Sequence, residues 1–123
     1  MANPNMVNVS SILGATTYLA LTTTSATTWT ALTPSAGTIN KIDTMMATNI
    51  TASPATITVS INSAISGGGT AYRLTFQTSV PGNSSLIVVD KSTMLYVGEA
   101  QSIVVTAGTA TAIEMVSTYE AIS

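Results

Sequence analysis

The sequence predicts an all-β protein: an antiparallel two-sheet β-sandwich, jelly-roll-like, with eight to nine strands and an extended N-terminal arm. Short runs of β-branched and aromatic residues alternate with turn-forming residues along the chain. The length of 123 residues suits one domain with its own core. We therefore expect residues 1–14 to form the arm and residues 15–123 to form a single sandwich domain.

Residues 84–106 carry the clearest signal for consecutive strands. Apolar runs at residues 86–89, 94–97 and 103–105 are separated by turn-forming residues. Each run is too short for a helix and has the composition of a strand. The pattern predicts a meander of three neighbouring strands.

The first 32 residues predict the arm and two short strands. The arm is rich in Asn and Ser, and its apolar residues include Val7, Val9 and Ile12. It either lies on a neighbouring subunit or forms a disordered or edge-pairing terminus. Strands are expected at residues 16–21 and 28–32. In the second, Trp29 is predicted to anchor the core or its rim, with a sugar-stacking platform as the alternative.

A long strand is expected at residues 38–50, after the turn at residues 33–37. Lys41 and Asp43 lie two residues apart and are expected to pair on one face. Met45 and Met46 are adjacent, so their side chains must point to opposite faces of the strand. At least one of them should therefore lie outside the core, unless another chain covers it.

Residues 55–61 and 70–77 are predicted to form a hairpin across the glycine-rich tip at residues 66–69, and residues 110–119 the final strand. Alternation of apolar and hydroxyl residues over 55–61 indicates a strand with one buried face. The predicted core comprises Ile57, Val59, Tyr72, Leu74, Phe76, Leu86, Val88, Ile103 and Val105.

The composition argues against several functional classes. Only 7% of residues are charged, against about 25% in ordinary soluble domains. The chain has no Cys or His and only three basic residues, so neither thiol chemistry, histidine catalysis nor nucleic-acid binding is expected. The apolar run at residues 86–89 is far shorter than the roughly 18 residues of a membrane span, and the N-terminus has no signal-peptide pattern.

No catalytic or metal-binding constellation is visible. The five carboxylates are scattered over turns and strands. Asp90 and Glu99 flank one predicted hairpin, where a cation site is the alternative and solvated turn residues are the preferred interpretation. We therefore expect no enzyme, no cofactor and no metal.

Several segments resemble small β-sandwich structural proteins of tailed bacteriophages. The resemblance rests on residues 80–86, on the turn pattern of residues 95–103, on residues 116–120 and on the N-terminal residues 2–9. Such proteins occur as capsid decoration (cement) proteins and as head, neck or tail accessory proteins. The resemblance implies a virion component, on the outer surface of the capsid or at the neck or tail.

The function expected from composition and resemblance together is a non-enzymatic virion structural protein. It would be a capsid decoration protein that stabilises the shell through subunit interfaces. Its expected partners are the major capsid protein and itself, as a homo-oligomer; the resemblance favours a trimer. A neck or tail accessory or fibre protein and a carbohydrate-binding module are the alternatives. The expected interface residues are Val7, Val9, Ile12, Met45 and Met46.

Overall fold

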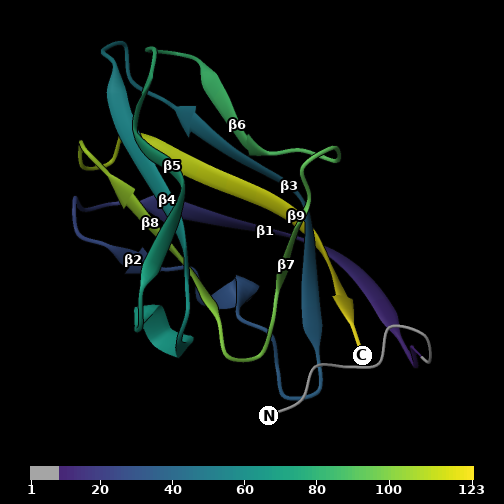
Figure 1. Cartoon of the computed structure of the whole chain (residues 1–123). Coiled ribbons are helices and arrows are strands. Elements are labelled where there is room, and N and C mark those ends of the chain that lie inside the picture. Colours follow the sequence, from purple (N-terminus) through teal and green to yellow (C-terminus); the bar gives the residue numbers. More distant parts are fainter. Residues whose placement is uncertain (1–8) are drawn as a thin grey trace.

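The structure, a computed structural model, describes residues 9–123, and these form a two-layered β-sandwich (Figure 1). The fold class predicted from the sequence is confirmed. The strands are β1 (Ile12–Leu21), β2 (Thr27–Thr28), β3 (Ile39–Asn49), β4 (Ala55–Asn62), β5 (Ala71–Val80), β6 (Ser85–Val89), β7 (Leu95–Val97), β8 (Ser102–Ala107) and β9 (Ile113–Ile122). Two single-turn 3₁₀ helices, η1 (Thr30–Leu32) and η2 (Ile65–Gly67), follow β2 and β4.

The two sheets have the strand order of a jelly roll. The first, which we call sheet A, has the order β1-β9-β3-β6, and β7 pairs with β3 beside β6. The second, sheet B, has the order β2-β8-β4-β5. Every pairing is antiparallel, and the chain crosses between the sheets repeatedly. Among the strands of residues 9–123, only β4 and β5 form a hairpin of neighbouring strands, so most pairing joins distant parts of the sequence.

Residues 84–106 form three strands as predicted, but the predicted meander is wrong. Strands β6 and β7 both pair with β3, along successive parts of its edge, and β8 lies in the other sheet. The eleven residues of β3 make this possible, because β6 pairs with Met45–Thr48 and β7 with Asn40–Ile42. The expected strand at residues 28–32 is also wrong, since most of it is η1.

The core lies between the sheets, and part of the predicted core is exposed. Four predicted residues are fully buried: Ile57, Val59, Ile103 and Val105. Leu86 and Val88 are half-buried and pack against the core. The other three are wrong, because Tyr72 is 63% exposed, Leu74 36% and Phe76 59%.

Irregular pairing of β5 explains this error. Val59 pairs with Thr75, but the next residue of β4, Ser60, pairs with Arg73, so Leu74 is an extra residue in the strand. A second register shift lies near Gln77, whose φ of 46° is in the left-handed region. Bulges of this kind re-aim side chains. The simple alternation assumed for residues 70–77 is therefore broken.

Large side chains from both sheets and from η1 complete the core. The fully buried ones include Trp29, Leu32, Ile42, Met45, Ile113 and Met115. Trp29 is 2% exposed, which confirms the predicted packing role and excludes a sugar-stacking platform at this residue. Its indole nitrogen has no hydrogen-bond partner within the part of the chain that the structure describes.

Buried amide and hydroxyl side chains hold the loops against the sheets. The Asn40 side-chain amide donates to the Leu32 carbonyl at 2.9 Å and so fixes η1. The Asn62 amide donates to the Gly67 carbonyl at 2.9 Å, and the Ser102 hydroxyl donates to Ala64 at 2.7 Å. These bonds fasten η2 to sheet B without charged groups.

The expected arm overlaps strand β1. Its last residues, 12–14, pair with the final strand, with Ile12 opposite Ile122. The backbone N–H groups of Ser10 and Ser11 donate to the Ser123 carbonyl at 2.6 and 2.9 Å. The sheet therefore begins earlier than expected, and residues 1–8 of the expected arm lie outside the described residues.

Candidate interaction surface

Four apolar side chains form one line across the outer face of sheet A. Strand register places Tyr18 opposite Val116, Val116 opposite Met46, and Met46 opposite Ile87. Tyr18 is 79% exposed, Ile87 63%, and Val116 and Met46 38% each. Neighbouring strands lie about 4.8 Å apart, so the line extends over about 14 Å. We call these four residues the apolar row.

Strand alternation explains why these side chains face outward. In β3, Met45 is fully buried while Met46 is exposed, and in β9 Met115 is buried while Val116 is exposed. In β1, Leu19 packs against the core and its neighbour Tyr18 does not. Three adjacent strands therefore show one residue to the core and the next to the outside.

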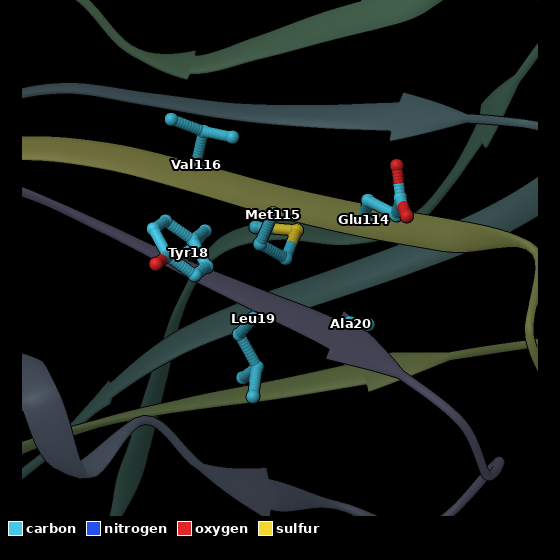
Figure 2. A pocket seen from close by; sticks show the side chains of 6 residues that line it. All are labelled: Tyr18, Leu19, Ala20, Glu114, Met115 and Val116. Carbon is cyan, nitrogen blue, oxygen red and sulfur yellow. The ribbon is translucent and has the colours of Figure 1, made fainter.

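A shallow pocket of about 260 Å³ lies at the β1–β9 end of the row (Figure 2). Its lining comes from two paired strands: Tyr18, Leu19, Ala20, Glu114, Met115 and Val116. Figure 2 shows Tyr18 of β1 beside Val116 of β9, with Glu114 further along the same strand. A contacting side chain would here meet mainly apolar atoms and one carboxylate.

Small and hydroxyl-bearing residues border the apolar row on both sides, together with Glu114 on the side of Thr48. On one side the hydroxyls of Thr48 and Ser85 lie 2.9 Å apart, and on the other those of Thr16 and Thr118 lie 3.3 Å apart. The four residues of the apolar row are themselves uncharged, and the Glu114 carboxylate lies in the border beside Thr48. Such a face can lie against another apolar surface with little desolvation of charged groups.

Charged residues lie toward the other end of sheet A. Lys41 of β3 is opposite Glu120 of β9 in the strand register. The Lys41 ammonium is 3.6 Å from the Asp43 carboxylate, which confirms the predicted pair. Both side chains remain partly exposed, so this ion pair adds little to stability.

The residues predicted for the interface have different positions. Met46 lies in the apolar row, and Ile12 is 61% exposed at the beginning of β1. Val9 is half-buried, and Val7 lies outside the described residues. The assignment of Met45 to the interface is wrong, because its side chain is the inward one of the methionine pair and is fully buried.

Sequence reasoning did not place Tyr18, Val116 or Ile87 at an interface. Each lies in a strand whose neighbours in sheet A are distant in sequence. Only the fold defines the order β1-β9-β3-β6 that brings these residues together. Alternation alone indicates which residues share a face of one strand. It does not show which strands lie side by side.

Strand β5 carries a second group of exposed apolar side chains, at the edge of sheet B. Tyr72, Leu74 and Phe76 are all exposed, and the guanidinium carbon of Arg73 lies 5.4 Å from the centre of the Phe76 ring. This distance allows a cation–π contact. Bulges interrupt β5, so its outer edge does not present a regular row of free backbone N–H and C=O groups. A partner would therefore contact the exposed side chains of this strand.

The two carboxylates considered for a cation site stabilise separate turns. The Asp90 carboxylate accepts hydrogen bonds from the Ser92 hydroxyl at 2.6 Å and the Ser92 N–H at 2.9 Å. These bonds, chiefly the one from the hydroxyl, lower the pKa of Asp90. Glu99 accepts from the Gly37 N–H at 2.6 Å. Among residues 9–123, no three acidic, His or Cys side chains form a group suited to a metal ion.

A second hollow, of about 330 Å³, lies beside η1 and η2. Only hydroxyl-bearing residues line it: Thr28, Thr30, Thr33 and Ser66. Its hydroxyl groups can donate and accept hydrogen bonds. Within the described chain, no helix has the length and apolar character needed to cross a membrane.

Comparisons with known proteins identify no relative of this chain. No family model, no curated protein and no solved structure matches the chain.

Proposed function

We propose that this protein is a non-enzymatic structural subunit of a virion, a capsid decoration protein that stabilises the shell through contacts between subunits. One observation supports the adhesive role: exposed apolar side chains gather on two separate parts of the sandwich. One group is the apolar row on sheet A, and the other is on β5, at the edge of sheet B.

Two adhesive surfaces on different sheets suit a protein that joins other subunits. Each Å² of apolar surface removed from water contributes about 25 cal/mol, so a few exposed aromatic and aliphatic side chains can hold a contact together. Large exposed apolar patches are uncommon on isolated soluble proteins. In this proposal, β5 contacts the major capsid protein and sheet A serves contacts between decoration subunits.

The phage assignment itself comes from the resemblance of the segments named above. A neck or tail accessory protein would use the same surfaces, so it remains the alternative. The third possibility, a carbohydrate-binding module, loses its main support because Trp29 is buried. Tyr18 is exposed, but its neighbours in the pocket include no Asn or Asp.

Binding of fluorescently labelled protein to purified, undecorated phage particles tests this proposal. We expect many copies spread over the shell, with binding that changes little as salt is raised, because three basic residues give little electrostatic attraction. A few copies confined to one vertex or to the tail would instead identify an accessory protein. No binding to any part of the particle would refute a virion role.

Variants of β5 test which surface contacts the shell. Phe76→Ser combined with Tyr72→Ser should reduce particle binding strongly, because both side chains are exposed and would be buried in the contact. Ile65→Ser is a matched control, since Ile65 is 53% exposed but lies in η2. Equal binding by the double variant and the control would contradict a role for β5.

A further inference from the structure

We propose that the outer face of sheet A binds the same face of a second copy of this chain. The two sheets pack face to face about a twofold axis that runs parallel to the strands, between β9 and β3. This inference specifies the self-assembly within the proposed function. It also predicts which residues of the two copies meet.

The strand order makes this face self-complementary. Four strands lie side by side in the order β1-β9-β3-β6, so the axis exchanges β9 with β3 and β1 with β6. Rotation about an axis parallel to the strands leaves each residue's position along the strands unchanged. The apolar row therefore meets itself in reverse: Tyr18 contacts Ile87 of the second copy, and Val116 contacts its Met46.

Polar groups on the same face are compatible with this arrangement. The row that contains Glu114 also contains Ala20, Thr48 and, opposite Thr48, Ser85. In the pair, Glu114 lies opposite Thr48 of the second copy and does not meet a second carboxylate. In the row that contains Glu120 and Lys41, the axis places Glu120 opposite Lys41 of the other copy. Opposite charges across an interface favour a defined register.

The area of the face is close to what a stable dimer needs. Strands β1, β9 and β3 have ten, ten and eleven residues, which at about 3.4 Å per residue gives about 34 Å in length. Four strands at about 4.8 Å give a width of about 19 Å, hence about 650 Å² in projection. Side-chain relief increases the accessible area further. A standard interface buries about 800 Å² per partner.

The pairing is isologous, so it closes after two copies. It therefore favours a dimer over the trimer that the resemblance suggested, because a trimer requires two different surfaces that contact each other. Each chain carries a net charge of −2, so the two copies repel weakly. Salt screens this repulsion and also the two Glu120–Lys41 contacts, so dimerisation should change little with salt.

Introducing opposite charges at the two ends of the apolar row tests both the dimer and its axis. Tyr18→Glu and Ile87→Lys each place one charge on an apolar contact and should weaken dimerisation at least about tenfold. The double variant, Tyr18→Glu with Ile87→Lys, should restore much of it, because the axis brings each new carboxylate against a new ammonium of the other copy. Within one chain the two sites are about 14 Å apart, too far to pair directly.

The measurement is sedimentation equilibrium of the full chain, with circular dichroism to verify that each variant is folded. Ile65→Ser, which changes a residue of η2 that is 53% exposed, should remain dimeric. A wild-type protein that is monomeric at high concentration, or trimeric, overturns the inference. A dimer that both single variants leave intact also overturns it, and one that the double variant does not restore refutes the proposed axis.

Particle binding separates this inference from the proposed function. Monomeric single variants that still bind particles support both the dimer through sheet A and the virion role through another surface. A dimer that behaves as predicted but does not bind particles refutes the virion role alone. If the wild-type protein is monomeric and Tyr18→Glu abolishes particle binding, the shell protein occupies this face. That result refutes a second copy of the chain as the occupant.

Discussion

Asn49 is a neutral residue whose side chain holds neighbouring segments together by hydrogen bonds, without an ion pair. It is fully buried at the end of β3, and all of its polar atoms are used. The amide donates to the carbonyls of Ser53 and Val80 at 2.8 and 3.0 Å. The side-chain oxygen accepts from the N–H and hydroxyl of Thr51 at 2.9 and 2.7 Å. One side chain thus joins the turn after β3 to the end of β5.

Replacing Asn49 by Leu should lower the free energy of unfolding by about 2–4 kcal/mol. The change removes the amide donor from the buried Val80 carbonyl and the acceptor from the Thr51 N–H, while the Ser53 carbonyl keeps its hydrogen bond from the Thr51 hydroxyl. Urea denaturation followed by tryptophan fluorescence measures the effect, since Trp29 is in the core. Thr16→Val, at an exposed hydroxyl of sheet A, is the control and should change stability by less than about 0.5 kcal/mol. Equal effects of the two changes would contradict this role.

Strand β5 shows how bulges decide which side chains form the core. Its aromatic residues have the composition of a buried strand, yet Thr75 and Thr78 are the residues opposite Val59 and Ile57. The sequence pattern predicted the existence of β5 within a few residues, because that depends on composition and turns. It did not predict the bulges, which depend on pairing with β4, and so it misplaced three core residues.

Substitutions in this hairpin should therefore have unequal effects. Ile57→Ala removes a fully buried side chain and should cost about 2–5 kcal/mol of stability. Phe76→Ala removes a larger side chain, yet it should cost less than about 1 kcal/mol because the ring is mostly exposed. Denaturant unfolding of both variants checks this order. A larger loss for Phe76→Ala would mean that this ring belongs to the core after all.

At the scale of the whole molecule, the sequence predicted two layers and a single sandwich but not the apolar row. The opposite directions of Met45 and Met46 followed from strand geometry alone. Which of them faces the core depends on the other sheet, and the partners of Met46 in the row come from β9 and β6. A surface made by strands distant in the sequence can be recognised only when the strand order is known.

Deletion of residues 1–8 tests the expected arm. We expect assembly on particles to weaken, because Val7 is among the apolar residues assigned to contacts between subunits, while the sandwich keeps its stability. The deletion stops before Ser10 and Ser11, whose N–H groups donate to Ser123, so pairing of β1 is preserved. Particle binding and thermal unfolding of the two proteins give the comparison. Equal assembly with and without these residues would refute a role for the arm.

The position of β9 also has a consequence for how the chain folds. This strand, the last in sequence, lies in the middle of sheet A, between β1 and β3 (Figure 1). During synthesis, β1 has no neighbour in its sheet until residues 113–122 leave the ribosome. Nearly the whole chain must then close as a loop before the first strand gains its hydrogen bonds. Folding should therefore be slow, on a scale of milliseconds to seconds, as in other proteins dominated by non-local pairing.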